Sequence, residues 1–142
     1  MTPRERIVAS ARRWIGTPYR HQASLIGVGC DCLGLVRGVW RDVIGPEPER
    51  APAYTSDWAE ATRREPLLEA GQRWFEPVDI GAFQAGDVLV FRWREGVAAK
   101  HLGIATSPVA MAHAHEGACV CEVTIAPAWR RRIVAAFAFP GC

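Results

Sequence analysis

Two cysteines that are one residue apart, Cys30 and Cys32, directly precede a stretch with helical periodicity. Apolar residues recur at i, i+1, i+4, i+5 and i+8 from Leu35 onward, which predicts a helix over about residues 31–44. Cys32 then lies at the helix N-terminus, where free backbone N–H groups and the helix dipole stabilise a thiolate. We therefore expect Cys32 to be a nucleophile with a lowered pKa, and Cys30, outside the helix, to be structural.

A thiol nucleophile requires a base, and two of the four histidines are spaced to provide one. His101 begins the strand-like segment HLGIAT, and His113 follows 12 residues later on what we expect to be the adjacent strand. A histidine at a strand end can face a helix terminus, while an imidazole on the neighbouring strand can orient it through a ring nitrogen. Cys32, His101 and His113 thus form a candidate triad. His115, on the same face as His113, is the alternative for the third position.

The cysteine pairs 30/32 and 119/121 also suggest a zinc site, because four thiolates suffice to bind zinc. Paired cysteines in structural zinc sites are usually separated by about two to four residues, whereas each pair here is separated by one. An odd number of cysteines, five, in a chain without a recognisable secretion signal argues against a disulfide framework. We expect no metal, no cofactor and mostly reduced thiols.

The composition is that of one globular domain. The 142 residues are 49% hydrophobic and 23% charged, and no run of about 18 apolar residues is available to span a bilayer. The N-terminal segment MTPRERIVASARRW is too interrupted by charge to be a signal peptide, so we expect synthesis in the cytoplasm without a signal peptide. A net charge of +2, with one short basic stretch at residues 129–132, does not indicate a nucleic-acid partner.

Helical patterns come first in the chain and strand patterns follow. Thr2, Pro3 and Glu5 have the spacing of a capping box at the start of a first helix. From Asp87 onward, five short segments rich in strand-forming residues are separated by turn residues: DVLVFRW, HLGIAT, MAHAH, ACVCEVTI and RIVAAFAF. This order predicts an α+β fold in which N-terminal helices, one with the nucleophile at its N-terminus, pack on an antiparallel sheet of about five strands.

The segment between these two parts, residues 45–78, is rich in charge and alanine. Within it, residues 56–75 predict one helix that is broken near Pro66. We interpret the segment as a peripheral helical insertion in a single domain that spans residues 1–142. Together with the basic stretch, it is expected to carry partner contacts, because exposed aromatic and arginine residues are enriched at interfaces.

Five motifs occur in the order and approximate spacing seen in the NlpC-type cell-wall cysteine peptidases. They are GTPY at 16–19, DCLGLV at 31–36, GDVLVF at 86–91, HLGIAT at 101–106 and MAHAHEGACVCEV at 111–123. The chain resembles this family over most of its length, with residues 45–78 outside the resemblance. The resemblance implies a papain-like α+β core and hydrolysis of an amide bond in the peptide stems of peptidoglycan.

Matched to the family motifs, Cys32 would be the nucleophile, His101 the general base and His113 the residue that orients His101. Tyr19 resembles the family tyrosine beside the cysteine. Together with Asp31, it is assigned to the oxyanion and substrate-binding side of the site.

The sequence departs from the family pattern at two places. Leu33 stands where a small serine usually follows the cysteine, and the segment after the tyrosine reads RHQASLIGVG. The first departure is expected to narrow the cleft, and the second bears on the choice of substrate.

Among NlpC-type proteins, the chain most resembles the small peptidases encoded with the tails of phages and gene transfer agents. Such a protein would be incorporated into a virion-like tail and would act at the cell wall, with peptidoglycan stem peptides and tail-tip or hub proteins as partners. Two alternatives remain: a catalytically idle structural tail-tip or assembly protein on the same fold, and a thiol acyltransferase, because an acyl-cysteine can pass its acyl group to an amine.

Overall fold

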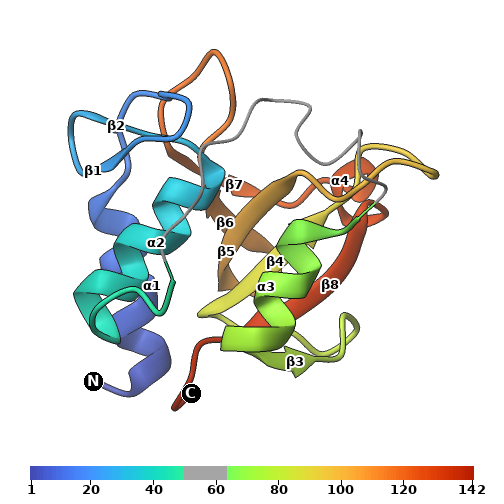
Figure 1. The fold of residues 1–142 in the computed structure, drawn as a ribbon, viewed down its shortest axis with the longest axis horizontal. Helices are drawn as coiled ribbons and strands as arrows, with labels where there is room; N and C mark the ends of the chain where they lie inside the picture. The colour runs from blue at the N-terminus through green and yellow to red at the C-terminus, as the bar shows by residue number, and fades with distance from the viewer. Residues whose placement is uncertain (50–63) are drawn as a thin grey trace.

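The structure, a computed structural model, describes residues 1–49 and 64–142 and has a six-stranded antiparallel sheet at its centre (Figure 1). The helices are α1 (Pro3–Arg13), α2 (Cys32–Val43), α3 (Pro66–Trp74) and α4 (Pro127–Arg130). The sheet has the order β3-β8-β4-β5-β6-β7, and in chain order these strands are Glu76–Val78 (β3), Asp87–Phe91 (β4), His101–Ser107 (β5), Ala110–His113 (β6), Cys121–Thr124 (β7) and Ile133–Ala138 (β8). A separate hairpin pairs β1 (Ser24–Leu25) with β2 (Gly29–Cys30).

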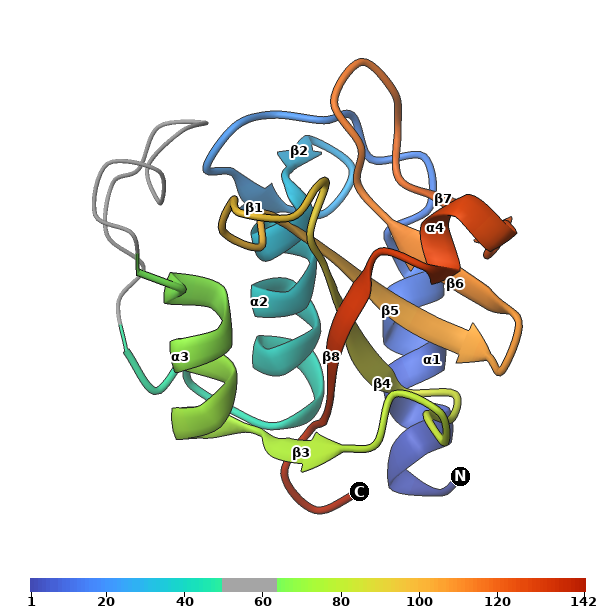
Figure 2. The same ribbon diagram turned by 90° about the vertical axis from the view of Figure 1, so that its right-hand side faces the viewer.

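The predicted fold class is confirmed. Helices α1 and α2 cover one face of the sheet, and they lie behind the strands in Figure 2. The five predicted strand segments correspond to β4 to β8, and the sixth strand, β3, comes from segment 45–78. Strand β3 is three residues long, contains Pro77 and lies at the sheet edge, which explains why the sequence shows no clear strand pattern there.

Local signals determine where the first two helices begin. Thr2 Oγ1 accepts the backbone N–H of Glu5 at 3.1 Å, and the Glu5 carboxylate accepts the backbone N–H of Thr2 at 2.9 Å, which is the predicted capping box. Helix α2 begins and ends within one residue of the predicted bounds, 31 and 44. Within the described ranges, no helix is long and apolar enough to cross a bilayer.

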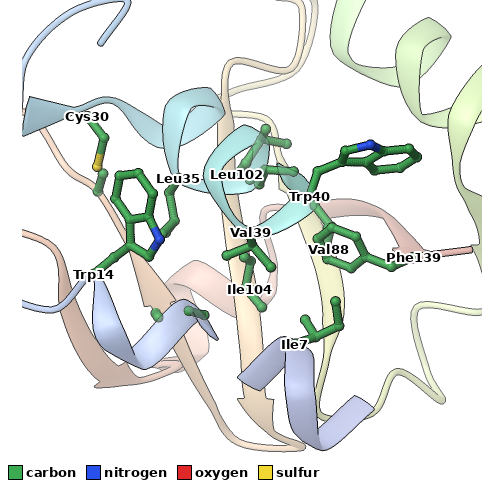
Figure 3. Packing of buried hydrophobic residues seen from close by; sticks show 14 of the residues in the cluster. Ile7, Trp14, Cys30, Leu35, Val39, Trp40, Val88, Leu102, Ile104 and Phe139 are labelled. Carbon is green, nitrogen blue, oxygen red and sulfur yellow. The ribbon is translucent and has the colours of Figure 1, made fainter. Parts of the chain in front are cut away.

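Apolar side chains cover both faces of the sheet. The core between the helices and the sheet includes Ile7, Trp14, Leu35, Val39, Trp40, Val88, Leu102, Ile104 and Phe139 (Figure 3). A second cluster lies on the other face and includes Leu89, Phe91, Ala105, Met111 and Ile133, with Trp129 of α4 packed against it. Side chains alternate along β5 between these two clusters, as the pleat of a strand requires.

The described part of segment 45–78 contributes to the core. Leu67 of α3 is buried, and a Cβ on Gly71 would lie 2.6 Å from the Phe137 ring, so α3 packs closely on β8. The helix predicted there corresponds to α3, which begins at its proline. Residues 56–63 of that prediction lie outside the described residues.

The basic stretch at residues 129–132 includes the end of α4 and makes contacts within the chain. Arg130 donates to the carbonyl oxygen of Pro108 at 3.0 Å. Arg132 donates to the carbonyl oxygen of Trp93 at 3.1 Å. These two guanidinium groups therefore hold neighbouring loops in place.

The crossing of α1 and α2 depends on Gly38, because a Cβ at this position would lie 2.0 Å from the buried Trp14 ring. We expect Gly38→Ala to lower the free energy of unfolding by about 1–3 kcal/mol, although alanine favours helix more than glycine does. Urea unfolding followed by circular dichroism measures this change. In a Trp14→Phe background the ring atoms that the Cβ would meet are absent, so the cost should be smaller. An equal cost in both backgrounds would contradict the packing argument.

Candidate active site

Cys32 is the first residue of α2, and its side chain is partly buried against the core. The thiol donates a hydrogen bond to the carbonyl oxygen of Lys100, with 3.7 Å between sulfur and oxygen. The backbone N–H of Leu102 also hydrogen-bonds the sulfur. The sulfur therefore contacts the backbone on both sides of His101. Its proton is directed to the carbonyl oxygen of Lys100, just before β5.

Asp31 caps α2 and joins it to the preceding loop. Its Oδ1 accepts the backbone N–H of Gly34 and its Oδ2 that of Gln22, both at 2.7 Å. Asp31 is 3% exposed, and a Cβ on Gly34 would lie 1.9 Å from the carbonyl oxygen of Ala23. The sequence assigns Asp31 to the oxyanion or substrate side of the site. The structure places both carboxylate oxygens on backbone N–H groups, where they fix the position of Cys32.

His101 and His113 form a buried, hydrogen-bonded pair. Nε2 of His101 lies 2.9 Å from Nδ1 of His113, and each residue is 4% exposed. The two rings are nearly perpendicular, at 85°, with their centroids 5.2 Å apart. Because one nitrogen of each ring is committed to this bond, His113 fixes the orientation of the His101 imidazole.

The register of β5 and β6 explains why His113, rather than His115, binds His101. Ile104 pairs with Ala112, so the same register continued along both chains would place His115 opposite His101. Strand β6 ends at His113, however, and His115 is exposed, with its ring centroid 5.8 Å from that of His101. The diagonal neighbour is therefore the residue whose ring nitrogen reaches His101.

Burial keeps the thiol and both imidazoles uncharged at neutral pH. It lowers the pKa of His101 to about 3, with added lowering from His113 and His115, and it lowers the pKa of His113 to about 4, with added lowering from His115. Burial, followed by the charge of Asp31, raises the pKa of Cys32 to about 12. The lowered thiol pKa expected from the helix position is therefore wrong. Desolvation and Asp31 outweigh the backbone N–H groups that favour the thiolate.

Tyr19 lies beside the candidate nucleophile. Burial, followed by the charges of Cys32 and Asp31, raises the pKa of the Tyr19 phenol to about 12, so the hydroxyl keeps its proton and can donate a hydrogen bond. A β-bridge joins Tyr19 to Cys30. Cys30 is fully buried, and burial together with Asp31 raises its pKa to about 12. Of these two cysteines, it is Cys32 that remains partly exposed and contacts the strand that carries His101.

Two tryptophans pack around the histidine pair, and the sequence did not indicate them as site residues. The Trp93 ring stacks on His101 with a centroid separation of 5.3 Å, and the Trp129 ring lies 5.2 Å from that of His113. Both tryptophans are followed directly by arginine: Trp93 ends the predicted strand segment DVLVFRW, and Trp129 begins the basic stretch at residues 129–132. A tryptophan followed by an arginine is the only sequence feature that the two positions share, and it does not indicate that either ring packs against a histidine.

The site combines a thiol, two imidazoles and a phenol, which are groups suited to nucleophilic attack on a carbonyl. All five cysteines are free thiols. The two cysteine pairs considered as zinc ligands differ in their surroundings, because Cys30 is buried whereas Cys119 is exposed. In residues 1–49 and 64–142, no group of three or more His, Cys, Asp or Glu side chains is arranged to hold a metal ion.

The lowered pKa values of the two buried histidines make the stability of the fold depend on pH. In the unfolded chain the two imidazoles are protonated near pH 6.5, whereas in the folded chain His101 and His113 are protonated only near pH 3 to 4. We expect stability to be full well above pH 6.5 and to fall as the pH drops through 6.5 toward 3 to 4, by up to about 1.4 kcal/mol per pH unit for each histidine. Urea unfolding at several pH values measures this slope.

The substitution His113→Gln should reduce that slope, because it removes one of the two buried imidazoles. His21→Gln, at an exposed histidine outside the pair, is the matched control. A wild-type slope in the His113 variant would show that the pair does not cause the pH dependence.

The sequence profile of the NlpC/P60 family matches residues 16–138, a range that includes Cys32, His101 and His113. The comparison with curated proteins finds no significant match. Solved structures share the fold. An NlpC/P60 family protein from Bacillus cereus ATCC 10987 has a TM-score of 0.69 and 17% identity, over 96% of this chain and 40% of its own.

Two other solved structures are similar. The NlpC/p60 domain of the peptidoglycan hydrolase SagA has a TM-score of 0.65 and 23% identity, over 96% of this chain and 98% of its own. A lipoprotein-like NLP/P60 family protein from Staphylococcus aureus subsp. aureus Mu50 has a TM-score of 0.63 and 18% identity, over 96% of this chain and 41% of its own. This chain thus spans about two fifths of the Bacillus and Staphylococcus proteins. Since the family profile covers most of its residues, the chain belongs to the NlpC/P60 family.

Proposed function

We propose that this protein is a cysteine endopeptidase that hydrolyses an amide bond in the peptide stems of peptidoglycan. The observation that carries the proposal is the hydrogen bond between His101, the first residue of β5, and His113. The Cys32 thiol lies close to this pair, because it donates to the carbonyl oxygen of Lys100, the residue before His101. Membership of the NlpC/P60 family supports it. So does the shared fold with the NlpC/p60 domain of SagA, which is itself described as a peptidoglycan hydrolase.

In the proposed mechanism, Cys32 is the nucleophile, His101 the general base and His113 the residue that orients the base. When Nε2 of His101 donates to Nδ1 of His113, the other nitrogen of His101, Nδ1, carries the free lone pair. This nitrogen takes the thiol proton as the sulfur attacks the substrate carbonyl carbon. The neutral thiol and imidazole thus pass directly to an imidazolium and a covalently bonded sulfur, and the negative charge appears on the substrate oxygen.

Charge then develops on the substrate oxygen. The Cys32 backbone N–H, at the N-terminus of α2, and the Tyr19 hydroxyl are the proposed donors to this oxyanion. His101 passes its proton to the leaving amine, the C–N bond breaks and a thioester remains on Cys32. Water, deprotonated by His101, attacks the thioester; the C–S bond breaks, the carboxylate product is released, and the Cys32 sulfur takes the proton back from His101, which restores the neutral thiol and imidazole.

We also propose that the enzyme works as a tail component of a phage or gene transfer agent. It would be synthesised in the cytoplasm, assembled with tail-tip or hub proteins and delivered to the cell wall. The resemblance of this short chain to the small NlpC-type peptidases encoded with such tails supports this role. Purified tails probed with an antibody against the chain test it, and tails that lack the chain would contradict it.

Replacement of the proposed nucleophile should separate chemistry from fold. We expect Cys32→Ala to abolish cleavage of muropeptides while the circular dichroism spectrum stays unchanged, because the side chain lies at a partly exposed helix end. Cys30→Ala is the matched control and should retain most activity, since Cys30 is a packing residue. Mass spectrometry of the products also distinguishes hydrolysis, which adds water, from acyl transfer to an amine. Equal loss in both variants would contradict the assignment, and uncut substrate with the wild-type protein would indicate a structural role.

The third triad position can be tested with the two histidines that surround His101. We expect His101→Ala to lower kcat on the order of 10²–10⁴-fold, as for loss of a general base. His113→Ala should lower kcat by less, because it acts through the ring orientation of His101. His115→Ala should change kcat little, because its exposed ring makes ring contacts but not that hydrogen bond. Steady-state kinetics on a soluble muropeptide measures all three, and a larger loss for His115 than for His113 would reverse the assignment.

A further inference from the structure

The rings of Trp93 and Trp129 enclose the histidine pair from two sides. The Trp93 indole, just beyond the end of β4, stacks on His101 with centroids 5.3 Å apart and an interplanar angle of 29°. Trp129 of α4 meets His101 and His113 with ring separations of 5.5 and 5.2 Å, at 68° and 83°. The two indoles also touch each other, at 5.2 Å. One indole thus covers a face of the base, and the other covers an edge of both imidazoles.

Hydrogen bonds to the backbone hold this enclosure in place. Nε of Arg132 donates to the carbonyl oxygen of Trp93 at 3.1 Å, and Nη1 donates to that of Ala128 at 2.7 Å. A single guanidinium therefore joins the segment that carries Trp93 to the helix that carries Trp129. Beneath them, the fully buried Phe91 packs edge-on against Trp129, with ring centroids 5.5 Å apart. The two indoles are parts of a fixed assembly and not loose surface side chains.

We propose that Trp93 and Trp129 are positioning residues, which hold the His101–His113 pair in its productive arrangement and keep water from its hydrogen bond. This inference rests on the proposed function, in which His101 is the general base. A hydrogen bond between two neutral rings is stronger where water does not compete for it. A ring that is packed between neighbours also stays in the orientation that the reaction requires. The indoles provide both conditions through their contacts with the two imidazole rings.

Among the described residues, the titratable neighbours of His101 add to the effect of burial on its pKa. Strand β6 and the turn after it contribute His113 and His115, both of which disfavour the imidazolium. Cys32 approaches from α2 beside the backbone of Lys100. Further out, Arg132 binds the Trp93 carbonyl, and the ion pair of Arg92 with Glu65 lies at the base of the loop that carries Trp93.

Removal of an indole leaves these groups in place and exposes His101 to water. Since burial is the main cause of its lowered pKa, hydration should raise the pKa of His101 from about 3 toward the ordinary value of 6.5. The base would then be protonated at a higher pH. The acid limb of the pH–activity profile should move upward in the same direction.

Nuclear magnetic resonance titration of the imidazole nitrogens, with the full chain, tests the enclosure independently of activity. We expect Trp93→Ala to raise the titration midpoint of His101 by at least about one pH unit, and Trp93→Phe to restore most of the difference. Trp74→Ala is the matched control, because Trp74 is 37% exposed and Trp93 is 36% exposed, but Trp74 lies at the end of α3. If Trp129→Ala fails to fold, the two Trp93 variants still give the answer.

Kinetics on a soluble muropeptide then connects the enclosure to catalysis. We expect Trp93→Ala to lower kcat by about tenfold with little change in KM, and to shift the acid limb to higher pH. An unchanged His101 midpoint in Trp93→Ala, whether or not the wild type cleaves the substrate, overturns the inference. The inference is also overturned if Trp93→Ala cleaves the substrate with the kcat and the pH profile of the wild type. A raised midpoint in a protein that never cleaves peptidoglycan supports the enclosure and contradicts the proposed function, so the two failures are distinguishable.

Discussion

The geometry of the site depends on the carboxylate of Asp31. Its two oxygens bind backbone N–H groups in two different segments, one in the first turn of α2 and one in the loop before β1. Hydrogen bonds to a charged group contribute about 1.5–3 kcal/mol each, so the helix cannot shift against the loop without a substantial loss. The first residue of that helix is Cys32, which is thereby held against the backbone that flanks His101.

The same carboxylate explains why the site rests in an uncharged form. A thiolate at Cys32 would be poorly hydrated and would be repelled by the negative charge of Asp31. An imidazolium at His101 would be buried beside two other imidazoles. Burial therefore disfavours each of the two charges, the thiolate and the imidazolium, before substrate binds. In the proposed mechanism, the charge that leaves the sulfur is transferred to the substrate oxygen, where the helix N-terminus and the protonated Tyr19 stabilise it. Proton transfer is then favourable only when it is coupled to attack.

Local patterns account for the parts of this structure that the sequence predicts. The Thr2 capping box, the start of α2 and strands β4 to β8 each follow from residues that are close in the chain. The candidate roles of Cys32 and His101 follow from residue type and from their places at element ends. The direction of the thiol pKa shift does not, because a helix N-terminus is visible in the sequence whereas burial against the strand is not. The contacts of Trp93 and Trp129 likewise arise from segments that only the fold brings together.

The hydrogen bond between His101 and His113 also requires that β5 and β6 pack closely, and a small residue makes this approach feasible. Gly103 lies two positions after His101, and a Cβ there would lie 2.7 Å from Sδ of Met111. Met111 is buried in the second apolar cluster, two positions before His113, so a side chain at position 103 would force the Met111 thioether to move within that cluster. The imidazole nitrogens are 2.9 Å apart, and a shift of about 0.3 Å would reach the limit of a good hydrogen bond. The close packing of Gly103 on Met111, in the middle of the sheet, thus lies beside the pairing of β5 and β6 that brings the two rings together, although Gly103 takes no part in the proposed chemistry.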